Sequence, residues 1–236
     1  MEYEPGASPR LAALACHPHP LYGGTMHNKV VFRAAKAAVR EGLPALRFNY
    51  RGVGKSEGKF GEGAGEEADV RAALENLCYR FSLPVVLMGF SFGSGVGLAV
   101  GAGDPRVVAL IGLGLAPARH DYSFLRQSRK PKLFIQGTED QFGPREEVES
   151  LVATLPPPKT MHWVDGVDHF FTGKLGEVEE VIRSFLRNIP AKAPADLYCP
   201  SCREPVHDPL VCGDCGAVIC RRCGTPLETA DELGIG

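Results

Sequence analysis

The chain has 236 residues, 44% hydrophobic and 23% charged, which is typical of one globular domain of ordinary size with room for a small appendage. Its formal net charge of −2 offers no electrostatic footprint for nucleic acid or for an anionic membrane surface. The N-terminal stretch lacks the basic and apolar segments of a secretory signal, and no apolar run is long enough to span a bilayer, so we expect a soluble cytoplasmic protein.

Short apolar runs alternate with longer amphipathic segments through residues 1–189, which we expect to form one α/β domain. The runs are continuously apolar, a pattern that predicts strands covered on both faces. Strands that alternate with helices at this spacing imply a mainly parallel sheet flanked by helices. The expected strands are 11–16, 43–49, 84–89, 107–113, 132–136 and 159–164, and the expected helices lie near 27–41, 66–81, 92–102, 144–155 and 174–188.

The loop after the first strand contains His17-Pro18-His19-Pro20. One interpretation is a pair of metal-binding histidines, but no third ligand is adjacent and the prolines restrict the rings. The other interpretation is a loop that offers a backbone N–H to a developing oxyanion. Proline has no N–H, so His19 is the first candidate donor, with Leu21 or Tyr22 next.

The loop after the second strand ends in Gly54-Lys55-Ser56, which resembles the end of a phosphate-binding loop. Such a loop requires a first glycine at residue 49, where this chain has asparagine, and a helix that begins at the Lys-Ser pair. A glycine-rich, helix-poor stretch follows instead. We therefore expect a turn without nucleotide binding.

The third strand runs into Gly89-Phe90-Ser91-Phe92-Gly93, which fits the G-x-S-x-G pattern. A helix rich in small residues follows directly, and a strand before and a helix after are the context that this nucleophile turn requires. The turn exposes the Ser91 hydroxyl and leaves the Phe92 N–H at a helix N-terminus, where it can stabilise an oxyanion. A glycine-rich packing turn is the alternative interpretation.

A serine nucleophile needs a base and an acid that orients the base. Asp140 follows the fifth expected strand, and Glu139 competes with it for the role of the acid. His169 follows the sixth strand, and its neighbour Asp168 is interpreted as a local loop carboxylate. Ser91, acid and histidine stand in the chain order of hydrolases that carry this turn.

The segments HPHPLYGGTMHNKVV, LRFNYRGVGKSEG, GFSFGSG, GTED and GVDHFF resemble the small α/β-hydrolases near dienelactone hydrolase and the prolyl-oligopeptidase-like esterases. The resemblance covers roughly residues 10–188 and implies an α/β-hydrolase domain over 1–189. It also implies that Ser91 is the nucleophile, Asp140 the acid and His169 the base, with one oxyanion contact from the HPHP loop. Dienelactone hydrolase itself uses a cysteine nucleophile, so the serine argues against that specific activity.

Two expectations about the size of the domain follow from this resemblance. Segment 114–131, where lid domains commonly enter, has room for one short helix but for no large cap domain. Few residues precede the first strand, so the antiparallel strands that often open the fold are expected to be missing or shortened.

The function expected from these residues is hydrolysis of a carboxylic ester or thioester of a small substrate through an acyl-enzyme, with no cofactor for catalysis. Aromatic side chains from several loops are candidates for the lining of an apolar acyl pocket. They are Tyr22, Phe92, Phe142 and Phe170. The alternative is a catalytically weak protein of the same fold that acts as a binding scaffold.

Three CxxC units follow a Pro/Ala linker at residues 190–197. A CxxC turn presents two thiolates on one side, and two such turns complete a tetrahedral sulfur site. We therefore expect structural zinc in a module over residues 198–227, followed by a tail at 228–236. The expected ligands are Cys199, Cys202, Cys212, Cys215, Cys220 and Cys223.

The pairing of the CxxC units stays open at this stage. Joining the first unit to the second would be ribbon-like, whereas joining the first to the third would be treble-clef-like and would leave the middle pair in need of partners. His207, and less favourably Asp208, are candidates for a second site. Docking to a protein partner or to a second copy is the expected role of the module, rather than nucleic-acid binding through its arginines.

Overall fold

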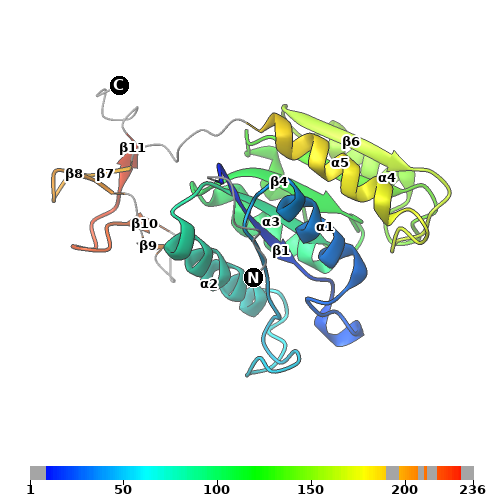
Figure 1. Cartoon of the computed structure of the whole chain (residues 1–236), viewed down its shortest axis with the longest axis horizontal. Coiled ribbons are helices and arrows are strands. Elements are labelled where there is room, and N and C mark those ends of the chain that lie inside the picture. The colour runs from blue at the N-terminus through cyan, green and yellow to red at the C-terminus, as the bar shows by residue number, and fades with distance from the viewer. Residues whose placement is uncertain (1–8, 190–196, 207–209, 212–216, 230–236) are drawn as a thin grey trace.

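The computed structural model describes residues 9–189, 197–206, 210–211 and 217–229 (Figure 1). Six parallel strands form one sheet in the order β2-β1-β3-β4-β5-β6. The strands are β1 (Ala12–Cys16), β2 (Ala45–Arg47), β3 (Val85–Phe90), β4 (Val107–Leu113), β5 (Lys132–Gly137) and β6 (Lys159–Val164). This confirms the expected sheet, and among the described residues no antiparallel strand joins it.

Five α-helices of the described residues lie on the two faces of the sheet, four of them between its strands and α5 after β6 (Figure 1). They are α1 (Lys29–Arg40), α2 (Ala64–Phe81), α3 (Phe92–Gly103), α4 (Arg145–Ala153) and α5 (Leu175–Asn188). One buried apolar cluster joins α1 and α5 to the sheet, and a second joins α2, α3 and α4 to the opposite face. The sheet is thus covered on both sides, which explains why its strands are continuously apolar.

The sequence of α1 shows why a helix forms beside the loop that follows β1. Asn28 caps its N-terminus by accepting from the N–H groups of Val30 and Val31. Small and β-branched residues on one face are buried, so the helix approaches the sheet closely. Buried Glu179 of α5 pairs with Arg33 and with Arg40 of α1, which joins the two helices on this face.

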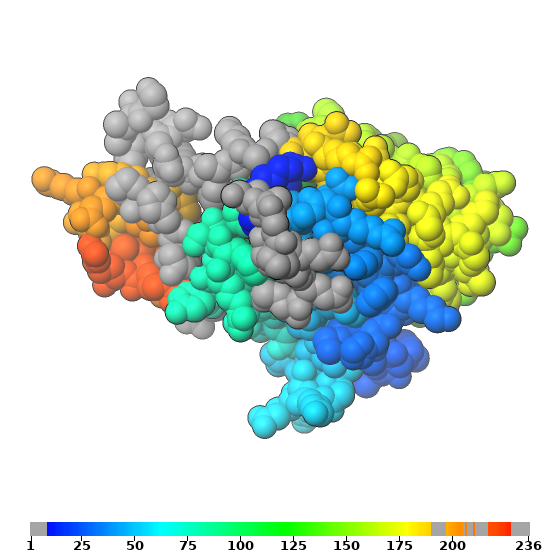
Figure 2. Space-filling model, viewed as in Figure 1, coloured from blue at the N-terminus to red at the C-terminus, as the bar shows by residue number. Residues whose placement is uncertain are grey.

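The described C-terminal residues form two small antiparallel sheets beside α2, at one end of the molecule (Figure 2). Strands β7 (Leu197–Cys199), β8 (Glu204–Val206) and β11 (Glu228–Thr229) make one sheet, and β9 (Leu210–Val211) and β10 (Val218–Ile219) make the other. Arg221 pairs with Glu75 of α2 at 3.1 Å. No helix in the described part of the chain is long and apolar enough to cross a membrane.

Candidate active site

Ser91 lies in a strained turn between the end of β3 and the start of α3. Its φ and ψ angles are 56° and −121°, a combination that is costly for a residue with a side chain. Its N–H donates to the carbonyl of Leu113 on β4 at 2.9 Å, which holds the turn against the sheet.

The two flanking glycines are required by close backbone contacts. A Cβ at Gly89 would lie 2.2 Å from the carbonyl oxygen of Gly93, and a Cβ at Gly93 would lie 2.5 Å from that of Cys16. The G-x-S-x-G pattern therefore follows from the geometry of this turn, and the turn presents the Ser91 hydroxyl at the carboxyl edge of the sheet.

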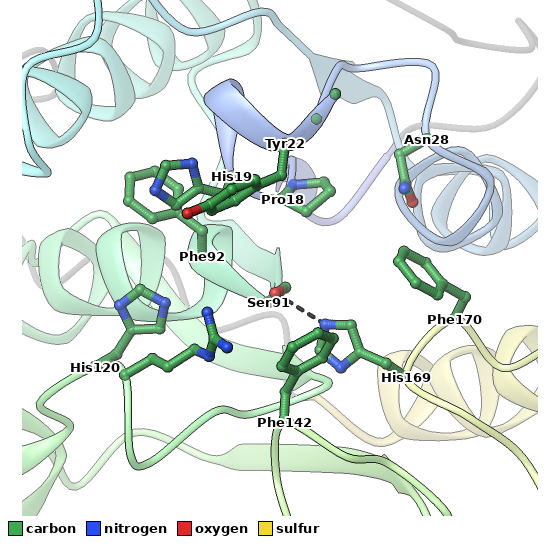
Figure 3. A pocket seen from close by; sticks show the side chains of 13 residues that line it. Pro18, His19, Tyr22, Asn28, Ser91, Phe92, His120, Phe142, His169 and Phe170 are labelled. Atoms are coloured by element: carbon green, nitrogen blue, oxygen red, sulfur yellow. Dashed lines mark hydrogen bonds between the residues drawn. The ribbon is translucent and has the colours of Figure 1, made fainter.

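Ser91, His169 and Asp140 form one row of hydrogen bonds. Ser91 Oγ lies 2.9 Å from His169 Nε2, and His169 Nδ1 lies 2.7 Å from Asp140 Oδ2 (Figure 3). A carboxylate only accepts hydrogen bonds, so the neutral imidazole carries its proton on Nδ1 and leaves Nε2 free to accept from the serine. Asp140 and His169 are both buried, which shields the hydrogen bond between them from water.

The loop after β5 fixes the carboxylate of Asp140. Its Oδ1 accepts from the N–H of Phe142 at 2.8 Å and from that of Gly143 at 3.3 Å. The competing acid, Glu139, is exposed. Asp168 is a local loop carboxylate as expected, because it accepts from the backbone N–H groups of Phe170 and Thr172.

Gln136 holds the carboxylate of Asp140 in place, and it was not among the residues expected from the sequence. It is fully buried, and its Nε2 donates to Asp140 Oδ2 at 2.7 Å. It also bonds both backbone groups of Leu115, at 2.7 Å and 3.1 Å, and the carbonyl of Gly143 at 3.2 Å. Gln136 therefore joins Asp140 and its own loop, through Gly143, to the loop after β4, through Leu115.

The two histidines of the first loop have separate roles, and within the described residues neither belongs to a cluster of metal ligands. His17 is buried, accepts from the N–H of Tyr50 at 3.1 Å and donates to the carbonyl of Pro18 at 2.6 Å. Burial lowers the pKa of His17 to about 4, so its ring is neutral at neutral pH. His17 thus fixes the base of the loop.

His19 lies in the same loop and lines the space in front of Ser91. Its ring lies 4.8 Å from that of Phe92 and accepts from the Leu21 N–H at 3.2 Å. The Tyr22 N–H donates to the His19 carbonyl. Two of the three candidate oxyanion donors are therefore engaged, whereas the described residues contain no acceptor bonded to the N–H of His19 or of Phe92.

A cavity of about 470 Å³ opens in front of Ser91 (Figure 3). Tyr22, Phe92, Phe142 and Phe170 all line it, as the sequence predicted. The sequence analysis missed three polar lining residues, Asn28, Arg119 and His120. The 3-10 helix at Ser123–Arg126 is the only helix of the described segment between β4 and β5, so no cap domain enters there.

A family model described as an alpha/beta hydrolase domain matches residues 22–183. The chain belongs to the α/β-hydrolase family. An uncharacterised protein of Rickettsia prowazekii (strain Madrid E) is 36% identical to it, over 75% of this chain and 79% of that protein.

Two solved structures of similar proteins agree with this family. An α/β serine hydrolase homologue from Coxiella burnetii is 38% identical, with a TM-score of 0.72 over 78% of this chain and 88% of that one. A serine hydrolase without a lid from Xanthomonas campestris is 34% identical, with a TM-score of 0.73 over 80% of this chain and 88% of that one. Together with the family model, they indicate a hydrolase.

The Gly-Lys-Ser tripeptide of this α/β-hydrolase lies in a turn, as predicted. The Ser56 N–H donates to Val53, and its hydroxyl donates to the carbonyl of Asn49 at 3.0 Å. Arg51 pairs with Asp69 of α2 at 2.9 Å, which fixes the turn to the helix. Since α2 begins at Ala64, no helix begins at the Lys-Ser pair, as a phosphate-binding loop would require.

Four of the six expected metal ligands come together in the C-terminal segment. The sulfur atoms of Cys199, Cys202, Cys220 and Cys223 all lie within 4.8 Å of one another and can hold a metal ion. This arrangement joins the first CxxC unit to the third, which the sequence had left open. The expected ligands Cys212 and Cys215, and the candidates His207 and Asp208, lie outside the described residues.

Proposed function

We propose that this α/β-hydrolase is a serine hydrolase that cleaves a carboxylic ester or thioester of a small substrate through an acyl-enzyme. The observation that carries the proposal is the row from Ser91 Oγ through His169 to Asp140, with separations of 2.9 Å and 2.7 Å, beside a cavity of about 470 Å³. A nucleophile, a base and an orienting acid within hydrogen-bond reach are what acyl transfer to serine requires.

The first half of the reaction transfers the acyl group to the enzyme. Ser91 Oγ attacks the acyl carbon while His169 Nε2 takes its proton, and Asp140 stabilises the charge that forms on the imidazole. The oxyanion of the tetrahedral intermediate accepts hydrogen bonds from the N–H groups of Phe92 and His19. Each such donor contributes roughly 10²–10³ in rate. The intermediate collapses as His169 returns the proton to the departing alcohol or thiol.

The second half releases the acyl group. His169 takes a proton from water, the resulting hydroxide attacks the acyl carbon, and the carbon–oxygen bond to Ser91 breaks. The proton on His169 then returns to Ser91 Oγ. No cap domain among the described residues covers the cavity in front of Ser91, so water can reach the acyl-enzyme there.

Labelling with a fluorophosphonate tests the proposal, because this probe reacts with an activated serine. Intact mass would be measured before and after treatment for the native protein, for Ser91→Ala and for Ser94→Ala. Ser94 is the other serine of this turn and its hydroxyl bonds the carbonyl of Ser91, so it is the matched control. We expect one adduct on the native protein and on Ser94→Ala, and none on Ser91→Ala.

Turnover of acetate and thioacetate esters by the same three proteins would follow. A folded native protein that takes no adduct and cleaves neither ester would contradict the proposal. It would favour the alternative of a binding scaffold with the same fold.

We also propose that the four clustered cysteines bind one structural zinc ion. Sulfur ligands at about 2.3 Å from a tetrahedral zinc lie about 3.8 Å from one another. The sulfur of Cys202 lies 3.9 Å from that of Cys220, and the sulfur of Cys223 lies 3.5 Å from those of Cys199 and Cys202. All four positions of such an ion would be filled by thiolates, which favours a structural role.

Native mass spectrometry tests this proposal, with Cys78→Ser as the control because Cys78 lies on α2 outside the cluster. We expect the native protein and the control to carry zinc, and Cys199→Ser to lose it. A metal-free native protein would contradict the proposal. The docking role of the module stays a prediction, and comparing the sedimentation of the native protein with that of Cys199→Ser tests self-association.

A further inference from the structure

Residues of opposite charge are unevenly represented in the described lining of the cavity in front of Ser91. Among the described residues, its lining contains Arg119 and three histidines but no aspartate or glutamate. Asp140 lies behind the cavity with its carboxylate bonded to His169. Glu66 acts electrostatically on His19, but its carboxylate is bonded to the N–H groups of Gly61 and Gly63. The described lining itself therefore presents the fixed positive charge of Arg119 to a substrate and no carboxylate.

The side chain of Arg119 is held at a defined place in this cavity. The backbone N–H of Arg119 donates to the carbonyl of Ala116 at 2.9 Å, in the turn after β4. Its guanidinium lies over the ring of Phe142, 4.7 Å from the ring centroid. The Phe142 ring is in turn 4.8 Å from that of His169, so a single aromatic ring separates the guanidinium from the imidazole.

Contact with Phe142 does not use up the hydrogen-bonding capacity of the guanidinium. The aromatic ring attracts the positive charge of the group, whereas its five N–H donors require oxygen acceptors. No carboxylate pairs with Arg119 within residues 9–189, 197–206, 210–211 and 217–229, although other exposed arginines such as Arg145 and Arg187 do have such partners. Burial lowers the pKa of His19, and the charge of Arg119 acts in the same direction, so that charge reaches the opposite side of the cavity.

We propose that Arg119 is a specificity-determining residue that binds an anionic group of the substrate, so that the preferred substrate is an ester or thioester with an acidic substituent. The inference rests on the proposed serine hydrolase activity and names the substrate class of that same site. A carboxylate matches the fork of the guanidinium with two parallel hydrogen bonds. Figure 3 shows Phe142 and His120 on one side of Ser91 and His19 and Tyr22 on the other, so the anion would lie on the Phe142 side.

The competing possibility is an uncharged acyl chain. Leu21, Tyr22 and Phe170 are 67%, 80% and 47% exposed, and the last two line the cavity. This apolar rim would favour a plain alkyl chain over a charged one. The two possibilities make opposite predictions for a pair of esters that differ mainly in charge.

The test uses p-nitrophenyl valerate, which is neutral, and p-nitrophenyl hemiglutarate, which has a comparable acyl chain ending in a carboxylate. The quantity measured is the ratio of kcat/KM for the anionic ester to that for the neutral ester. The variants are Arg119→Met, which keeps the length of the side chain without its charge, and Arg119→Lys, which keeps only the charge. Arg145→Met is the matched control, because Arg145 also lies over an aromatic ring, 4.3 Å from the centroid of Trp163, but outside the cavity.

We expect the native protein to prefer the anionic ester and Arg119→Met to lower the ratio roughly tenfold, the size of a charge–charge contact near a protein surface. Arg119→Lys should give an intermediate ratio and Arg145→Met the native one. Added salt should reduce the preference of the native protein and not that of Arg119→Met.

Two results would overturn the inference while leaving the proposed function intact. They are a native protein that cleaves the neutral ester as well as the anionic one, and an Arg119→Met variant with the native ratio. A native protein that cleaves neither ester and takes no fluorophosphonate adduct would overturn the proposed function and the inference together.

Discussion

Replacing Gln136 with leucine tests whether the support of Asp140 matters for both stability and turnover. The side chain of Gln136 makes four hydrogen bonds, to Asp140, to both backbone groups of Leu115 and to the carbonyl of Gly143. Leucine has a similar size but neither donates nor accepts. The substitution therefore removes the bonds without leaving a large cavity.

The magnitude follows from the kinds of bond lost. A hydrogen bond to a charged carboxylate contributes about 1.5–3 kcal/mol, and each neutral bond about 1 kcal/mol. The groups of Leu115 and Gly143 that lose their partner are buried, so they lose hydration as well as the bond. We expect Gln136→Leu to lower the free energy of unfolding by about 5 kcal/mol. The less restrained Asp140 should orient His169 poorly and lower kcat roughly tenfold.

Urea unfolding and ester turnover measure the two effects in the same protein. Gln127→Leu is the control, because it makes the same chemical change at an exposed glutamine. It should shift the unfolding midpoint little and leave kcat at its native value. If Gln136→Leu unfolded at the same urea concentration as the control and kept its kcat, Gln136 would have no supporting role.

Two further predictions concern His17 and Gly114. The pKa of His17 is lowered by burial from 6.5 to about 4 in the folded chain, so the unfolded chain binds the proton first as the pH falls. The lowered pKa contributes about 3 kcal/mol to the free energy of unfolding above pH 6.5, and this contribution is lost as the pH falls toward 4. In urea unfolding between pH 7.5 and 4.5, His17→Asn should therefore lose less of its free energy of unfolding than the native protein does. A Cβ at Gly114, where φ is +55°, would lie 2.9 Å from Phe90 and 3.0 Å from His169, so Gly114→Ala should displace the imidazole and lower kcat more than tenfold. Gly103→Ala, where a Cβ meets nothing within 4 Å, is the comparison, and equal turnover of the two variants would exclude a displaced His169.

The elements predictable from sequence are those whose cause is local. The expected strand at 107–113 matches β4, because a run of apolar residues long enough to cross a covered sheet has few other conformations. The turn at Ser91 was predictable because its glycines are required by contacts within a few residues and with the adjacent strand. In contrast, β2 spans Ala45–Arg47 instead of the expected 43–49, since it pairs only with β1 and that pairing covers three residues.

The pairing of the cysteine units was not predictable, because the CxxC units are alike within their own turns. What brings Cys199 and Cys202 to Cys220 and Cys223 is the pairing of β7 with β8 and β11, a contact between distant parts of the chain. No local property of one CxxC unit encodes which of the other two it meets.

Gln136 did carry a signal in the sequence that went unused. It is the single polar residue inside the apolar run Leu133–Gly137, and a polar side chain on a strand covered on both faces must find partners there. Because Gln136 directly precedes the loop of Asp140, partners for its side chain were to be expected at the candidate site. Arg119 carried no such signal, since an arginine in a loop is usually solvated. Its significance depends on Phe142, which arrives from the loop after β5, and on the lack of an acid in the described lining of the cavity. The residues proposed to perform the chemistry are thus tied to recurrent backbone turns, whereas the residue proposed to select the substrate depends on which loops meet, and only the folded chain reveals it.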